Sequence, residues 1–194
     1  MNSFFQAGTN HQLVVAFHGT GGNEYQLLTT VATLFPKASL LSFRGSVGEG
    51  AQRRFFAPLI NGQLERNDFQ QRVQFFLTQE WAKIETPYQE IIFIGYSNGA
   101  NFILGLLEQE PNLADTIILL HPSRLVYSFT PSKKAVQLIL TSGAQDTISL
   151  PGEALKLSEE LKSNFPNTTL LLTDGGHAFN EQEISALKKQ LGGS

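Results

Sequence analysis

The chain of 194 residues is 41% hydrophobic and 16% charged, and its formal net charge is −3. This mildly acidic composition argues against a nucleic-acid-binding protein, which needs a clustered excess of lysine and arginine. The sequence contains no cysteine, so disulfide bonds, thiolate metal sites and a cysteine nucleophile are all excluded. A chain of this length suits one domain, over residues 1–194.

The N-terminal segment 1–12 lacks the basic start and the sustained apolar run of a signal peptide. No segment of the sequence approaches the roughly 20 apolar residues that a membrane-spanning helix needs. We therefore expect a cytoplasmic protein with no membrane partner.

Short runs rich in leucine, isoleucine and valine alternate along the chain with longer segments of helical period. Because several of these runs are apolar at nearly every position, they predict parallel strands that helices cover on both faces. The predicted strands are residues 13–17, 39–43, 90–95, 116–121, 136–142 and 168–173.

The helices between the strands are predicted from spacing and from end signals. Segment 67–84 carries apolar residues three and four positions apart, which indicates one buried face. A second helix is expected over about 151–164, where a proline occupies the first turn, and a third over 180–191. In the third helix, Asn180 and Glu183 have the spacing of a capping box.

The order of these elements predicts a three-layer α/β/α sandwich around a mostly parallel sheet. The helix that follows the first predicted strand is expected to have Asn23 as its N-cap. Segment 44–66 is glycine-rich and aperiodic, so we expect a long loop there that forms a wall of a binding site.

One strand-to-helix junction carries the pattern G-x-S-x-G, as Gly95-Tyr96-Ser97-Asn98-Gly99. A sharp turn at this junction would expose the Ser97 hydroxyl above the sheet, and the small residues on either side would let neighbouring backbone pass. A tight structural turn is the alternative reading of the same pattern. Ser97 is the candidate nucleophile.

A serine nucleophile needs a base, and the base needs an acid that orients it. Asp146 follows one of the later predicted strands and His177 follows the next, so both lie with Ser97 at the carboxyl ends of parallel strands. Asp174 is the rival acid, but it lies on the same short loop as His177. His121 ends a strand and either lines the site or has a structural role.

The turn His18-Gly19-Thr20-Gly21-Gly22 follows the first strongly predicted strand. It has the form of a turn that supplies a backbone N–H to the oxygen that becomes charged during acyl transfer. We assign one such oxyanion-hole N–H to Thr20 and the other to Asn98, the residue after the candidate nucleophile. A phosphate-binding loop is disfavoured because the lysine of a P-loop is missing.

These motifs resemble the α/β-hydrolase superfamily and, within it, the phospholipase/carboxylesterase family of small serine esterases. The resemblance implies an α/β-hydrolase fold without a lid domain, a Ser97–His177–Asp146 triad, and hydrolysis of carboxylic esters without a cofactor. The motifs that carry it appear in the family's order as FHGTGGNE, SFRGSVGEG, RRFF, IGYSNGAN, LLHPS, SGAQDTISLP and DGGH.

The substrate of such an enzyme is expected to be a small-molecule ester, aromatic or anionic. The candidate substrate-binding residues combine apolar and cationic side chains, although the phenylalanines could instead pack into the core and the arginines face solvent. These candidates are Arg44, Phe55, Phe56 and Tyr96, with Arg53 and Arg54 nearby.

Two other functions use the same sequence features. A thioester hydrolase would need the same triad, and a non-catalytic binding protein could use the same scaffold. The four histidines show no paired metal-binding spacing, so no metal is expected. The sequence leaves open whether the protein is a monomer or a homodimer.

Overall fold

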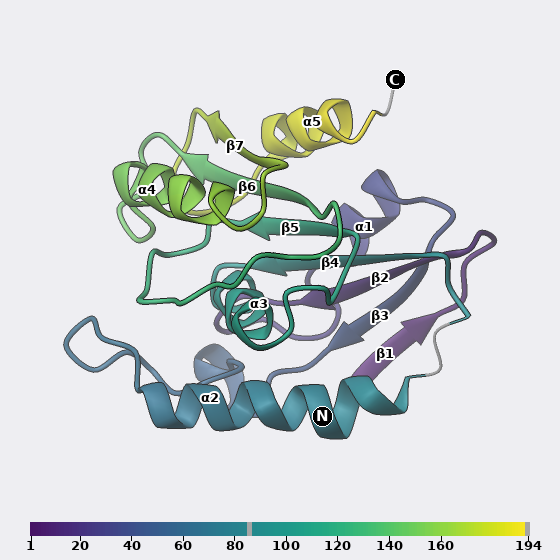
Figure 1. Cartoon of the computed structure of the whole chain (residues 1–194), viewed down its shortest axis with the longest axis horizontal. Helices are drawn as coiled ribbons and strands as arrows, with labels where there is room; N and C mark the ends of the chain where they lie inside the picture. Colours follow the sequence, from purple (N-terminus) through teal and green to yellow (C-terminus); the bar gives the residue numbers. More distant parts are fainter. Residues whose placement is uncertain (85–86, 193–194) are drawn as a thin grey trace.

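The computed structural model describes residues 1–84 and 87–192. Seven strands form one sheet in the order β1-β3-β2-β4-β5-β6-β7, in which β1 pairs antiparallel with β3 and every other neighbouring pair is parallel (Figure 1). The strands are β1 (Ser3–Gln6), β2 (Gln12–Phe17), β3 (Ser39–Phe43), β4 (Glu90–Tyr96), β5 (Thr116–Leu120), β6 (Gln137–Gly143) and β7 (Thr168–Thr173).

Within the described part of the chain, five α-helices pack on the two faces of this sheet. Helix α2 continues without a break into a π-helical turn, η2 (Phe76–Glu80), and a 3₁₀ turn, η3 (Trp81–Lys83). The α-helices are α1 (Leu28–Leu34), α2 (Arg66–Phe75), α3 (Asn98–Gln109), α4 (Pro151–Lys162) and α5 (Glu181–Gln190), and a short 3₁₀ helix, η1, covers Gly50–Gln52.

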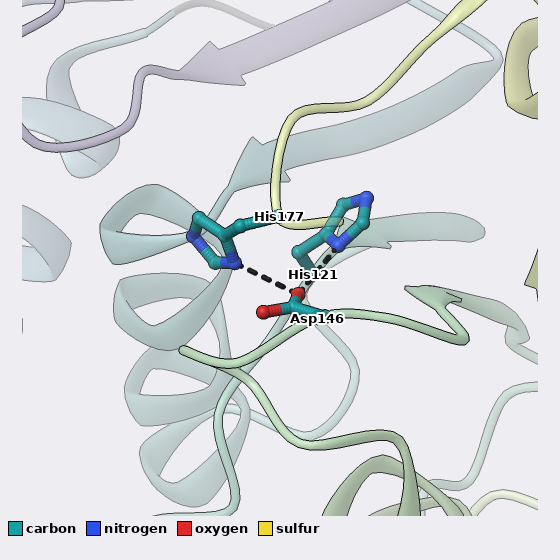
Figure 2. A group of neighbouring side chains, drawn as sticks. All are labelled: His121, Asp146 and His177. Atoms are coloured by element: carbon teal, nitrogen blue, oxygen red, sulfur yellow. Dashed lines mark hydrogen bonds and ion pairs between the residues drawn. The ribbon is translucent and has the colours of Figure 1, made fainter. Parts of the chain in front are cut away.

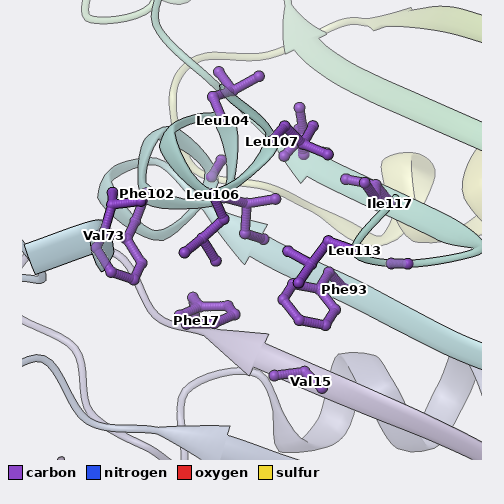
Figure 3. Close-up of a cluster of buried hydrophobic side chains, with 14 of the residues drawn as sticks. Val15, Phe17, Val73, Phe93, Phe102, Leu104, Leu106, Leu107, Leu113 and Ile117 are labelled. Carbon is purple, nitrogen blue, oxygen red and sulfur yellow. The ribbon is translucent and has the colours of Figure 1, made fainter. Parts of the chain in front are cut away.

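The hydrophobic core consists of two clusters, one on each face of the sheet. Alternate residues of β2 show the division: Val15 and Phe17 join the cluster under α2, α3 and α4, whereas Val14 and Ala16 join the cluster under α1 and α5. Figure 3 shows the first cluster, where Phe17 lies close to Phe102 of α3. The predicted three-layer α/β/α sandwich with a mostly parallel sheet is therefore confirmed.

All six predicted strands are present, but β1 was not predicted. Its residues, SFFQ, are mostly exposed, because β1 is an edge strand that pairs with β3 on one side alone. Without buried apolar alternation, this segment carries no periodic signal.

The predicted cap of the first helix is wrong. Helix α1 begins at Leu28, its N-cap is Leu27, and no side chain caps it. Asn23 instead closes a turn, since its Oδ1 accepts a hydrogen bond from the Tyr25 N–H. A chain segment rich in glycine separates the strand from the helix here, so the helix starts one turn later than expected.

None of the helices over residues 1–84 and 87–192 has the length and apolar character needed to cross a bilayer. The loops that follow β2, β4, β6 and β7 all leave the sheet at the carboxyl ends of its parallel strands. The candidate site lies at this edge.

Candidate active site

Ser97 lies on a sharp turn between β4 and α3. Its φ of 51° is in the left-handed region, which a residue with a side chain seldom adopts. The flanking glycines permit this turn: a Cβ on Gly95 would meet the carbonyl carbon of Gly99 at 2.6 Å, and one on Gly99 would meet the carbonyl oxygen of Phe17 at 2.2 Å. Backbone therefore passes on both sides of the serine with no room for larger residues.

The side chains of Ser97, His177 and Asp146 form a continuous hydrogen-bonded chain. His177 Nδ1 lies 2.8 Å from Asp146 Oδ2, and His177 Nε2 lies 2.8 Å from Ser97 Oγ. Because an ionised carboxylate only accepts hydrogen bonds, Nδ1 is the protonated nitrogen and Nε2 is free to accept the serine proton. The three loops that carry these residues thus meet in the arrangement that a nucleophile, a base and an orienting acid require.

The Asp146 carboxylate is buried and fully hydrogen-bonded. Its Oδ1 accepts from the backbone N–H groups of Ile148 and Ser149, each at 2.8 Å. Burial opposes ionisation, but hydrogen bonds from His121, from His177 and from these two N–H groups outweigh it, so the pKa of Asp146 lies below its ordinary value. Asp146 is therefore an anion at neutral pH.

Asp174, the rival acid, is exposed, and its carbonyl oxygen accepts a hydrogen bond from Asn180 Nδ2. It thus helps to close the loop that precedes α5. Asn180 caps that helix by accepting a hydrogen bond from the Glu183 N–H, which is half of the predicted capping box. The other half is absent, because the Glu183 side chain turns into the protein and bonds His121.

The sequence left the role of His121 open and predicted Glu183 only as part of a capping box, but both residues contact the site. His121 Nδ1 lies 2.9 Å from Asp146 Oδ2, so the same carboxylate oxygen receives two imidazoles, as Figure 2 shows. The nitrogen and oxygen donor atoms of His121, Asp146 and His177 lie within 4.8 Å of one another, a spacing that could hold a metal ion. Direct hydrogen bonds among the three side chains account for that closeness.

The Thr20 N–H in the glycine-rich turn after β2 has no acceptor among the residues that the structure describes. The N–H groups of Gly19, Gly21 and Gly22 donate to Gln26 Oε1, to the Arg53 carbonyl and to the Gly19 carbonyl, respectively. Over residues 1–84 and 87–192, neither the Thr20 N–H nor the Asn98 N–H at the start of α3 has a protein acceptor. This lack of an acceptor is what the two assigned oxyanion-hole groups require.

Three hydrogen bonds hold the glycine-rich turn and the 44–66 loop in place. Buried His18 accepts from the Gly45 N–H through Nε2, and its Nδ1 donates to the Gly19 carbonyl. Burial lowers the pKa of His18, which favours this neutral form. On the other side, the Asn98 side chain accepts from the Phe55 N–H at 2.8 Å.

The prediction that Phe55 and Phe56 form a substrate wall is wrong. The two residues are 0% and 3% exposed, so neither offers a surface to a bound molecule. The Phe55 ring packs on Phe17 and Phe102, and the Phe56 ring packs edge-on against Phe69. Burial of these rings anchors the 44–66 loop to the core.

Tyr96 contacts the loop of His177, whereas Arg44 lies in the segment that bonds the glycine-rich turn. The Tyr96 hydroxyl donates to the His177 carbonyl, and the Tyr96 ring lies 5.6 Å from the His177 ring, so Tyr96 supports the histidine loop. Arg44 Nε lies 3.7 Å from Glu24 Oε2, and Arg44 lines a polar hollow. The other lining residues are Met1, Asn2, Gly45, Ser46, Gly48, Glu49, Gly50 and Arg53. Arg53 also donates to the Gly22 carbonyl, which ties the hollow to the glycine-rich turn.

The comparisons with known proteins agree with this geometry. No family model matches the sequence. The chain is 29% identical over 193 residues to "Putative hydrolase MhqD" of Bacillus subtilis (strain 168), covering 97% of this chain and 96% of that protein. It is 28% identical over 186 residues to "Esterase YpfH" of Escherichia coli (strain K12), covering 89% and 78%.

Among solved structures, the carboxylesterase of Bacillus cereus is similar, with a TM-score of 0.85 and 29% identity over 99% of this chain and 93% of that one.

Proposed function

The chain belongs to the α/β-hydrolase superfamily, in agreement with the phospholipase/carboxylesterase family that its sequence resembles, and on this premise we propose that it is a serine carboxylesterase of small esters. The observation that carries the proposal is the hydrogen-bonded chain from Ser97 through His177 to Asp146. Relatives named as hydrolases and esterases, which align with nearly the whole chain, support the same class of reaction.

The first half of the reaction forms an acyl-enzyme. His177 Nε2 takes the Ser97 proton while Ser97 Oγ bonds to the carbonyl carbon of the ester. The carbonyl oxygen becomes negatively charged and accepts hydrogen bonds from the N–H groups of Thr20 and Asn98, each worth about 3–4 kcal/mol in a site of this kind. The C–O bond to the alcohol then breaks, and His177 gives its proton to the departing alcohol oxygen.

The second half returns the enzyme to its starting state. Water loses a proton to His177 and bonds to the acyl carbon, and the Ser97 oxygen leaves with the proton that His177 returns. Asp146 holds His177 in the required tautomer in both halves, because its oxygen accepts from Nδ1 and leaves Nε2 available.

The proposed substrate class rests on the hollow that Arg44 and Arg53 line. Arg44 adds positive charge to the polar hollow beside the glycine-rich turn, and its contact with Glu24 is long, at 3.7 Å. This favours small esters with an anionic group. Arg44→Gln should therefore raise KM for the hemi-ester of a dicarboxylic acid while leaving KM for a neutral ester unchanged, and equal effects on both esters would rule Arg44 out.

The proposal is tested by hydrolysis of 4-nitrophenyl acetate by the unaltered protein and by Ser97→Ala. We expect turnover in the first and none above background in the second, with both proteins folded by circular dichroism. Undiminished turnover by Ser97→Ala would contradict the proposal. A parallel assay with the matching thioester measures which acyl donor reacts faster.

A further inference from the structure

A second imidazole bonds the carboxylate oxygen of Asp146 that His177 uses. His121 Nδ1 lies 2.9 Å from Asp146 Oδ2, and His121 Nε2 lies 3.0 Å from Glu183 Oε2. His121, Asp146 and Glu183 are all buried, and Figure 2 shows the two rings meeting at the carboxylate. The hydrogen-bonded chain that starts at Ser97 therefore continues to Glu183.

The two carboxylates determine the charge of His121. Each ring nitrogen faces a carboxylate oxygen, and ionised carboxylates only accept hydrogen bonds, so His121 carries two ring protons. This cation balances one of the two buried negative charges, which would otherwise be costly. Burial opposes the cation, but the hydrogen bonds and charges of Glu183 and Asp146 outweigh it and raise the pKa of His121 above its ordinary value.

The titratable groups around His121 come from four parts of the fold. Asp146 and His177 follow β6 and β7, Glu183 lies on α5, and Tyr96 ends β4 with its ring 6.2 Å from that of His121. The two histidine rings are 5.4 Å apart. Burial and then the charges of Asp146 and Glu183 raise the pKa of the Tyr96 hydroxyl, which stays neutral.

We propose that His121 and Glu183 are positioning residues of the active site, which hold Asp146 against His177 and limit how tightly His177 retains a proton. This inference rests on the proposed function. Because the His121 cation shares Oδ2 with His177, part of the carboxylate charge is already balanced when the serine proton arrives. His177 then returns that proton more readily to the leaving alcohol.

The test replaces the pair by a neutral one, His121→Asn with Glu183→Gln. One positive and one negative charge are removed together, so the net charge is kept. Asparagine suits position 121, where φ is 50°, because it tolerates the left-handed region. Without the cation, His177 retains its proton more strongly, and the acidic limb of the rate of reaction with a fluorophosphonate should move to higher pH.

The expected shift follows from the distance between the rings. A unit charge 5.4 Å from His177 is worth about two pH units at an effective dielectric constant of about 20. The Glu183 charge, which is bonded to the far nitrogen of the His121 ring, acts in the opposite direction. We expect a net shift of about one pH unit in the midpoint of the limb.

Glu181→Gln provides a matched control, because Glu181 is an exposed glutamate two residues earlier on α5. The acidic limb of its pH–rate profile should have the same midpoint as in the unaltered protein. A folded, reactive double variant whose midpoint is unshifted, or moves to lower pH, would overturn the inference. The proposed function is tested separately by fluorophosphonate labelling, which should occur in the unaltered protein and be absent in Ser97→Ala. This result does not depend on the midpoint of the acidic limb.

The unaltered protein gives a second test, which holds even where the double variant does not fold. Imidazole ¹⁵N spectra at pH 6.5, the ordinary pKa of histidine, report how many protons most His121 rings carry. Two protonated nitrogens are expected. A single protonated nitrogen at that pH would overturn the inference.

Discussion

Replacing Asp146 by asparagine gives the sharpest prediction about the hydrogen-bonded chain. The carboxylate accepts four hydrogen bonds: Oδ1 from the N–H groups of Ile148 and Ser149, and Oδ2 from the imidazoles of His121 and His177. An asparagine has one oxygen with which to satisfy these two pairs of donors. The orientation that it adopts decides the outcome.

The amide oxygen is expected to face the two backbone N–H groups. The reverse orientation would leave both of these buried donors unsatisfied, at about 1–3 kcal/mol each. The NH₂ group then faces the Nδ1 atoms of His177 and His121, and both must become acceptors, which imidazoles can do and backbone N–H groups cannot. His121 therefore loses its Nδ1 proton, and the His177 proton moves to Nε2. That nitrogen cannot take the Ser97 proton, and kcat should fall about 10⁴-fold, or about 5 kcal/mol.

The assay is kcat for 4-nitrophenyl acetate, with Asp174→Asn as the matched control. Asp174 is exposed and lies on the loop of His177, so the control changes a neighbouring aspartate without touching the chain of hydrogen bonds. The control should keep full activity. If Asp146→Asn stays folded and loses less than about tenfold in kcat, the tautomer argument fails.

Three further predictions concern stability. Gly99→Ala should lower the free energy of unfolding by about 1–3 kcal/mol, because its Cβ would lie 2.2 Å from the Phe17 carbonyl oxygen. The control Gly152→Ala, whose Cβ meets nothing within 4 Å, should be neutral or stabilising. Equal urea midpoints for the two variants would contradict this prediction. Asn180→Ala should cost about 1 kcal/mol by removing the side-chain cap of α5, and an unchanged midpoint would mean that the cap is replaced by solvent. Because folding lowers the pKa of Asp146, its ionised carboxylate stabilises the folded protein at any pH above 3.8, the ordinary aspartate pKa. This stabilisation is lost as the pH falls below 3.8. The stability gap between the unaltered protein and Asp146→Asn should therefore narrow from pH 7 to pH 3, and a constant gap would refute the assignment.

Six of the strands could be predicted, because buried parallel strands leave a strong local signal. Residues 116–120, TIILL, are buried at every position and have no other plausible structure. The edge strand β1 could not be predicted, because exposed edge residues follow no apolar pattern. The late start of α1 was not predicted either, because no side chain caps this helix and Asn23 closes a turn before it.

The site was predictable where a motif ties a residue to a strand end. Ser97, Asp146 and His177 each follow a strand that the sequence shows plainly, and a parallel sheet brings such positions to one edge. Phe55 and Phe56 lie in an irregular loop, where sequence gives no direction for a ring, and they face the core.

Glu183 was misread for a different reason. Its spacing from Asn180 fits a capping box, and a surface cap explains a glutamate at that position. The buried partner that draws its side chain inward, His121, is 62 residues away along the chain, and no local pattern links the two. Long-range polar pairs of this kind become visible only when the fold is known.

The central claim is that Ser97 is the nucleophile of the site. The most direct measurement is to react the protein with a fluorophosphonate and to map the modified residue by peptide mass spectrometry. We expect one adduct, on the peptide that contains Ser97, formed at a rate that depends on the protonation of His177. An adduct on another residue, or none in the folded protein, would contradict the account.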